Sequence, residues 1–276
     1  MGIDLTQRQD VAAHLSGIAL AAGALLRGLQ GRVAGRLKED GSPTSGADLA
    51  AEALILARLA QAWPAVPIVA EETACLAAAG GVFFLADPLD GTKAYLAGEP
   101  EYTVNIALVA HGRPVAGVVL APALGRIWRA GDRAEGARFE PAEEEPSLVF
   151  APLRTRPAPS RGAVALVSKR HGDPASEAAL VALAAPERRT ASSAMKFGLI
   201  AEGEADVYVR CARTMEWDTA AGDAVVTLAG GTVVGSDGAP LTYGHRERAY
   251  ANGCFAALGD RSLAGRLRLP DRCHTG

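Results

Sequence analysis

The chain has 276 residues, of which 49% are hydrophobic, and a formal net charge of −3 from 28 basic and 31 acidic side chains. This length and composition suit one large domain or two packed halves, and they exclude a globally disordered chain. The slightly acidic balance argues against broad nucleic-acid binding, which requires a basic surface, although a local site can still take a small anion.

The N-terminal region and the cysteines lead us to expect a cytoplasmic protein. Residues 1–10 are polar and show no signal-peptide pattern, and the apolar stretch 18–29 is too short to span a bilayer. The cysteines lack CxxC spacing and a histidine cluster, which predicts scattered reduced thiols rather than a zinc site; they are Cys75, Cys211, Cys254 and Cys273. We expect a soluble protein without a transmembrane segment, and peripheral association with the inner membrane is left open.

Two helices and a mostly antiparallel sheet are predicted for the first half. Apolar residues at three- and four-residue steps predict helices over 5–29 and 48–62, joined by a loop over 38–47. Ser45 and Asp48 are alternative N-caps of the second helix. A helical turn is expected over 93–97. Apolar runs bounded by turn residues predict the strands, which are 68–70, a strand from Phe83, 102–109, 115–120 and 125–130.

A change in composition over residues 138–162 marks a predicted boundary. This stretch contains several prolines and the run Glu143-Glu144-Glu145. We therefore divide the chain into halves, 1–150 and 151–276. Strands and helices alternate in the second half, which predicts an α/β layer. The expected strands are 163–168, 205–210, 232–234 and 250–253, and the expected helices are 174–184, 194–202, 217–228 and 258–267.

The most informative stretch is Asp87-Pro88-Leu89-Asp90-Gly91-Thr92, which follows an apolar strand. Pro88 fixes its own φ, and Gly91 permits backbone angles that a side chain would forbid. The chain is expected to leave the strand in an abrupt turn that presents two carboxylates and the Leu89 carbonyl together. Such oxygen ligands suit Mg²⁺. The alternative is an Asx-type turn that only ends the strand.

Other candidate residues also have structural alternatives. Glu71 and Glu72 follow a short strand, so their side chains should point in opposite directions, one to a site and one to a support. Asp48 and Asp218 each open a helix, and the structural alternative to a site role is that each only caps that helix. Lys196, after Ser192-Ser193, is either a solvated residue or a contact for a second phosphate. Arg210 and Arg213 are further phosphate candidates.

Together, five stretches resemble the inositol monophosphatase superfamily of lithium-sensitive, magnesium-dependent phosphomonoesterases. They are Ser42 to Asp48, Glu71-Glu72, the Asp87 to Thr92 turn, Ser192 to Glu202, and Trp217-Asp218-Thr219-Ala220-Ala221-Gly222. Lys93, residues 101–108, 193–197 and 201–203 are most similar to the bacterial 3'(2'),5'-bisphosphate nucleotidases. Two departures, Thr44-Ser45 for Val-Thr and Ala94-Tyr95 for Glu-Phe, weaken the substrate assignment more than the reaction.

The resemblance implies a layered α/β fold of the sugar-phosphatase type, with layers in the order αβαβα. It also implies two or three Mg²⁺ ions. Glu71 and Asp87 would hold the first ion, and Asp87, Asp90 and Asp218 the second. The implied metal ligands are Glu71, Asp87, the Leu89 carbonyl, Asp90 and Asp218.

The resemblance further implies that Thr92 bonds the attacking water and that Asp48 accepts from Thr92. Glu71 would help to activate this water, and Glu72 would orient the metal ligands. Substrate contacts are expected from the ligand set and the neighbouring turn; they are Glu71, Leu89, Asp90, Gly91, Thr92, Ser193, Lys196 and Asp218.

The implied reaction is hydrolysis of adenosine 3',5'-bisphosphate to AMP and phosphate, which clears a by-product of sulfate assimilation and is inhibited by lithium. One alternative is an inositol-1-monophosphatase or another sugar phosphatase. A second is a non-catalytic metal-binding scaffold. In each enzymatic case the partner is a small phosphate compound rather than nucleic acid, and the protein is a monomer or a homodimer.

Overall fold

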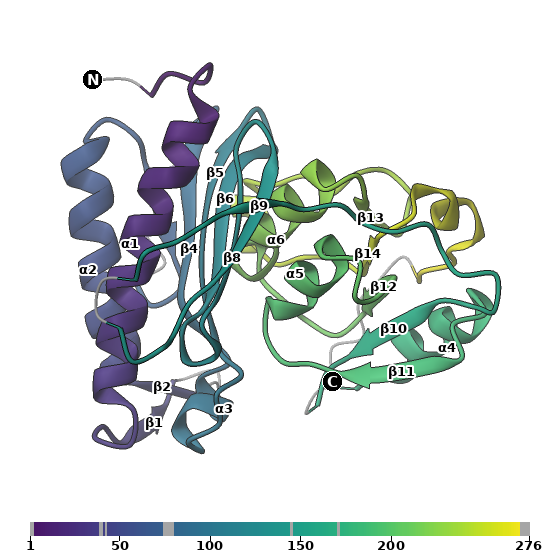
Figure 1. Cartoon of the computed structure of the whole chain (residues 1–276), viewed down its shortest axis with the longest axis horizontal. Coiled ribbons are helices and arrows are strands. Elements are labelled where there is room, and N and C mark those ends of the chain that lie inside the picture. The colour runs from purple at the N-terminus through teal and green to yellow at the C-terminus, as the bar shows by residue number, and fades with distance from the viewer. Residues whose placement is uncertain are drawn as a thin grey trace.

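The computed structural model describes residues 3–38, 41, 43–73, 80–143, 146–169 and 172–270. Ser42, the Glu144-Glu145 pair and the cysteines Cys75 and Cys273 lie outside these ranges. The described chain forms five alternating layers of helices and sheets (Figure 1). The predicted layered α/β fold, in the order αβαβα, is confirmed.

The first layer consists of two long helices, α1 (Arg8–Leu29) and α2 (Gly46–Ala62). The predicted start of α1 is three residues too early, because residues 5–7 precede the first helical turn. Among the described residues, α1 alone is long and apolar enough to cross a membrane by length and composition. Its apolar face, which includes Leu15, Ile18 and Leu26, is buried against α2 and the neighbouring sheet, as in a packing helix of a protein core.

The second layer is a seven-stranded sheet in the order β3-β4-β5-β6-β7-β8-β9. Its strands are β3 (Ile68–Ala70), β4 (Val82–Asp90), β5 (Thr103–Ala110), β6 (Arg113–Ala121), β7 (Arg126–Ala130), β8 (Ala134–Arg138) and β9 (Ala151–Pro152). Strand β3 is parallel to β4, and the other pairs are antiparallel. The last two strands were not predicted, and β9 lies just beyond residue 150.

Short elements fill the connections around this sheet. The predicted loop over 38–47 is partly wrong, since β1 (Gly35–Leu37) and β2 (Pro43–Ser45) form an antiparallel pair. The expected helical turn is present as α3 (Thr92–Leu96), and a 3₁₀ turn, η1 (Pro122–Leu124), follows β6.

The second half supplies a five-stranded sheet in the order β11-β10-β12-β14-β13. Its elements are β10 (Val164–Val167), α4 (Pro174–Ala182), β11 (Glu187–Thr190), α5 (Met195–Ala201), β12 (Val207–Arg210), α6 (Glu216–Leu228), β13 (Thr232–Gly235), η2 (Arg246–Arg248), β14 (Phe255–Leu258) and η3 (Arg261–Arg266). The predicted final helix over 258–267 is wrong. Leu258 ends β14 between β12 and β13, and a 3₁₀ helix follows it.

Helices α5 and α6 form the middle layer, and each approaches its neighbours closely at a glycine. A Cβ atom added to Gly117 of β6 would lie 3.0 Å from the Ala221 Cα of α6. Gly198 of α5 packs against the Trp128 ring, and Gly222 of α6 packs against the Phe197 ring, without room for a side chain. These contacts fix the helices against the first sheet and against each other.

Candidate active site

Strand β4 carries the central motif. Its residues alternate between two cores, with Phe83 and Leu85 facing the middle layer and Phe84 and Ala86 facing α1 and α2. A sheet buried on both faces needs such a continuous apolar run. The expected abrupt turn after Ala86 is wrong, because β4 continues through Pro88 to Asp90 with a shift of register.

The turn itself occurs at Gly91, whose φ of +99° lies in the left-handed region. One Asp87 carboxylate oxygen accepts from the Leu89 N–H at 2.9 Å. The Asx-type turn and the site geometry therefore coexist, since the same carboxylate also lines a cavity.

This cavity, of about 300 Å³, brings the two halves of the chain together. Its lining includes all the predicted metal ligands, which are Glu71, Asp87, Leu89, Asp90 and Asp218. Gly91, Thr92 and Ser193 also line the cavity. The lining also contains residues for which no site role was predicted, although several belong to the motifs described above; they are Pro43, Lys93, Ala94, Ser168, Ser192, Met215 and Trp217. A larger hollow of about 680 Å³, between residues 158–163 and η3, contains none of the predicted site residues.

Burial and mutual repulsion both raise the pKa values of the cavity carboxylates. Burial raises the pKa of Asp87 well above its usual value, and the charges of Glu71, Asp90 and Asp218 raise it further. Burial also raises the pKa of Asp218, assisted by Asp90 and Glu71. One Asp218 carboxylate oxygen accepts from the Met215 N–H at 2.8 Å, so the predicted capping contact is present as well. Like charges held together in this way favour a bound cation.

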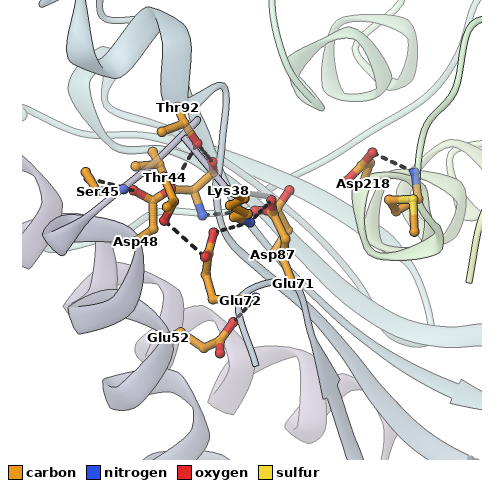
Figure 2. Close-up of polar contacts among 12 residues, drawn as sticks. Lys38, Thr44, Ser45, Asp48, Glu52, Glu71, Glu72, Asp87, Thr92 and Asp218 are labelled. Carbon is orange, nitrogen blue, oxygen red and sulfur yellow. Dashed lines mark hydrogen bonds and ion pairs between the residues drawn. The ribbon is translucent and has the colours of Figure 1, made fainter. Parts of the chain in front are cut away.

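Glu71 and Glu72 share one cationic partner. The Lys38 ammonium lies 2.9 Å from a Glu71 oxygen and 2.7 Å from a Glu72 oxygen (Figure 2). The prediction that these carboxylates point to opposite sides is wrong, because their long side chains converge on Lys38. Burial opposes the lysine charge, but the two glutamates outweigh it and raise the pKa of Lys38. The sequence gives no local signal for this contact, since the partners are over 30 residues apart.

Glu72 is not one of the residues that line the cavity. Its carboxylate accepts from the Thr44 hydroxyl at 3.0 Å, and its N–H donates to Glu52 at 2.7 Å. Glu72 therefore connects β2, α2 and the end of β3. This position suits the supporting role that was predicted for it.

The Thr92–Asp48 contact is present as predicted (Figure 2). The Thr92 hydroxyl donates to Asp48 at 2.9 Å, and the other Asp48 oxygen accepts from the Ser45 N–H at 2.8 Å and the Ser45 hydroxyl at 2.6 Å. Ser45 is the N-cap of α2. Burial raises the pKa of Asp48, although the hydrogen bonds from Ser45 and Thr92 oppose this shift. A capping carboxylate thus also orients a hydroxyl at the cavity wall.

Ser193 and Lys196 occupy different environments. Ser193 lines the cavity, has a φ of +55°, and donates from its hydroxyl to the Asp90 carbonyl at 2.8 Å. Lys196 is only 4% exposed, and its ammonium donates to the Ser193 carbonyl at 2.7 Å and lies over the Tyr208 ring. Burial lowers the pKa of Lys196 to about 8. The hydrogen bond from Lys196 supports the backbone at Ser193, and a contact of Lys196 with a phosphate stays a prediction.

The two arginines predicted as phosphate contacts lie in different environments. Arg213 is exposed. Arg210 lines a second cavity of about 460 Å³ together with Arg188, Tyr208 and Asp173. Ser168 belongs to the lining of both cavities, so the second cavity adjoins the first.

Within the ranges that the structure describes, no three histidine, cysteine, aspartate or glutamate side chains already form a closed cluster of metal ligands. The donor chemistry nevertheless fits a hard cation, because the cavity collects carboxylates and a main-chain carbonyl. Buried carboxylates that raise each other's pKa are the second observation in favour of this fit.

The profile of the Inositol monophosphatase family matches residues 7–267. The chain belongs to the inositol monophosphatase family. Among members of this family, the 3'(2'),5'-bisphosphate nucleotidase CysQ of Escherichia coli (strain K12) is 38% identical over 213 residues, which cover 76% of this chain and 83% of that protein. The Haemophilus influenzae protein of the same name is 30% identical over 238 residues, covering 82% and 84%.

Solved structures of the inositol monophosphatase family agree with this assignment. CysQ from Bacteroides thetaiotaomicron superposes with a TM-score of 0.78 at 29% identity, covering 92% of this chain and 98% of that one. A Thermotoga maritima inositol monophosphatase has a TM-score of 0.70 at 23% identity, covering 90% and 94%, and supports the fold alone. The predicted resemblance to the bacterial nucleotidases is therefore confirmed.

Proposed function

We propose that this protein is a 3'(2'),5'-bisphosphate nucleotidase that hydrolyses the 3'-phosphate of adenosine 3',5'-bisphosphate to give AMP and phosphate. The observation that carries the proposal is the convergence of Glu71, Asp87, Leu89, Asp90 and Asp218 on one cavity. The names of the bacterial relatives support the same reaction.

The residues proposed to hold Mg²⁺ are Glu71 and Asp87 for one ion and Asp87, Asp90 and Asp218 for another, with the Leu89 carbonyl beside them. Bound Mg²⁺ would offset the carboxylate charge and stabilise the negative charge that develops during displacement at phosphorus. Lithium is expected to inhibit by competing for these positions. Glu72 would support them through its contacts with Thr44 and Glu52.

Thr92 and Asp48 are proposed to orient the attacking water. The Thr92 hydroxyl donates to Asp48, so its oxygen lone pairs are available to accept a hydrogen bond from water. Glu71 lines the same cavity and would accept a proton from that water. Gly91 and Ser193, which line the same cavity, would contact the phosphate.

The adjoining cavity favours a nucleotide over a smaller sugar phosphate. It extends from Ser168 into a space lined by Arg188, Arg210 and Tyr208. Guanidinium groups suit a second phosphate, and an aromatic wall suits a base. We therefore propose a substrate with both a nucleoside and a second phosphate, in the cytoplasmic recycling of a sulfate-assimilation by-product.

A substrate panel tests the proposed function. Phosphate release from adenosine 3',5'-bisphosphate, inositol 1-phosphate and simple sugar phosphates is measured with Mg²⁺ and after chelation. We expect Mg²⁺-dependent release, fastest with the bisphosphate and inhibited by lithium. Faster release from inositol 1-phosphate would overturn the substrate assignment, and no release from any compound would favour the non-catalytic alternative.

Substitution of Thr92 tests the proposed water-orienting pair. Thr92→Val removes the hydroxyl that donates to Asp48, and we expect kcat to fall by about 100-fold. Thr92→Ser retains the hydroxyl and should stay within about tenfold of the parent. Steady-state kinetics at saturating Mg²⁺ distinguish the variants, and equal losses in both would show that the hydroxyl is not what matters.

A further inference from the structure

Helix α6 determines where Asp218 lies. Asp218 occupies the first turn of this helix, and the helix rests on β6 with Gly117 and Ala221 in close contact. A small rotation or sliding of α6 would therefore move Asp218 relative to Asp87 and Asp90, which belong to β4 in the first sheet. The contacts that hold α6 in register are thus relevant to the whole cavity.

One buried carboxylate, Asp223, connects α6 to the first half of the chain. Asp223 has no exposed surface. Its oxygens lie 3.3 Å from both terminal nitrogens of Arg113, the first residue of β6. They also accept from the Tyr243 hydroxyl at 3.0 Å and from the Thr227 hydroxyl at 2.8 Å. A single side chain therefore joins α6, β6 and the segment that contains Tyr243.

That segment, residues 241–245, is held at several points. The Leu241 carbonyl accepts from Arg113, and the Tyr243 N–H donates to the Gly112 carbonyl at 3.0 Å. Glu216 of α6, which is also fully buried, accepts from the Gly244 N–H at 2.6 Å and the His245 N–H at 3.0 Å. The segment is therefore fixed between α6 and the turn that joins β5 to β6.

We propose that Asp223 is a positioning residue for the proposed metal site. By holding α6 against β6, Asp223 sets the position of Asp218 relative to Asp87 and Asp90. Asp223 lies five positions beyond Asp218 and lines neither cavity at the site. It acts through the helix and not by contact with metal or substrate. This inference rests on the metal-dependent function proposed above.

Charge on Asp223 distinguishes this role from simple packing. Burial raises the pKa of Asp223 to about 6, although Arg113 opposes the shift. Among the described residues, the titratable groups in contact with Asp223 are Arg113 from β6 and Tyr243 from the 241–245 segment. Burial raises the pKa of Tyr243 well above its usual value, so the tyrosine stays neutral. The ion pair with Arg113 should therefore be complete above about pH 7 and weakened below about pH 5.

The test compares the affinity of the parent and of Asp223→Asn for Mn²⁺, a probe of oxygen-ligand sites, by the EPR signal of the free ion. Asparagine mimics the uncharged acid at every pH. We expect the ratio of the two dissociation constants, variant over parent, to be near one at about pH 5 and about ten at about pH 7.5. Protonation of the metal ligands affects both proteins and cancels in the ratio.

Asp206→Asn is the matched control, because Asp206 is equally buried and pairs with Arg156 at 2.8 and 2.9 Å. Its ratio should stay near one at both pH values. Arg113→Gln, which keeps the aspartate, should reproduce the Asp223→Asn result, and the double variant should be no worse than either single one. This provides a second route if Asp223→Asn folds poorly.

The outcomes separate the inference from the proposed function. Binding of Mn²⁺ by the parent, with a ratio that does not change with pH or that changes equally for Asp206→Asn, would overturn the positioning role and leave the proposed function intact. If the parent binds no Mn²⁺, the proposed metal site fails and the inference fails with it.

Discussion

Asp87→Asn should make the metal-free protein more stable while lowering its phosphatase activity by about 10³-fold. The Asp87 charge is buried and repelled by Glu71, Asp90 and Asp218, so removing it relieves an unfavourable interaction. The asparagine carbonyl can still accept from the Leu89 N–H, which preserves the turn. Residues that serve function often lower stability. We expect Asp87→Asn to raise the free energy of unfolding by about 1–2 kcal/mol.

Thermal unfolding at about pH 8 in the presence of a chelator measures this effect, and we expect the melting temperature to rise by roughly 2–6 °C. Asp206→Asn is a matched substitution with the opposite expected sign, because Asp206 has a bidentate arginine partner, whereas Asp87 has no arginine partner among the described residues. A fall in the stability of Asp87→Asn equal to that of Asp206→Asn would show that the Asp87 charge is not unfavourable in the folded protein.

Gly91→Ala should disrupt both the stability and the activity of the protein. The φ of +99° at Gly91 disfavours any side chain, and the new Cβ would overlap with the Ser193 hydroxyl. Moving Ser193 aside would break its hydrogen bond to the Asp90 carbonyl, and Asp90 would then shift. We expect a loss of about 3 kcal/mol in the free energy of unfolding and at least about 100-fold in activity, because small displacements of reacting groups are costly.

Gly98→Ala separates the effect of backbone strain from the effect of the overlap with Ser193. Gly98 also has a positive φ, of +75°, but a Cβ atom there would meet nothing within 4 Å. This variant should lose about 1 kcal/mol of stability through backbone strain and retain its activity. Thermal unfolding and phosphate release are measured for both variants in parallel. Similar activity in both would mean that the contact between Gly91 and Ser193 has no role in the site.

Much of the fold follows from local sequence patterns. The helical period of the stretch around Leu15 and Leu26 predicts α1, and the apolar run at Phe83–Leu85 predicts β4, because each element buries a continuous apolar surface. The residues of the candidate site could also be predicted from the sequence, since its carboxylates lie in or beside distinctive turn motifs. For Asp48 and Asp218, helix capping and a position at the candidate site hold at once, because each makes a capping-box contact. Asp218 also lines the cavity, and Asp48 accepts a hydrogen bond from Thr92, which lines it.

Other features have no local signal. Strand β11 contains Glu187 and two arginines and lies at a sheet edge, so it lacks an apolar pattern. Strand β14 is a short, alanine-rich segment whose position depends on β12 and β13. The contacts of Lys38 with Glu71 and of Arg113 with Asp223 join residues far apart in the chain. Such pairs are determined by the packing of layers, which no local window of sequence contains.

The middle layer has a consequence for how the protein folds and admits substrate. Because α5 and α6 are covered by a sheet on each side, separating the two halves would expose apolar helical surface to water (Figure 1). Neither fragment is therefore expected to fold alone, and the whole chain should unfold as one cooperative unit. Entry of substrate must then rely on short segments at the cavity mouth, since a hinge between the halves would have to break this shared interior.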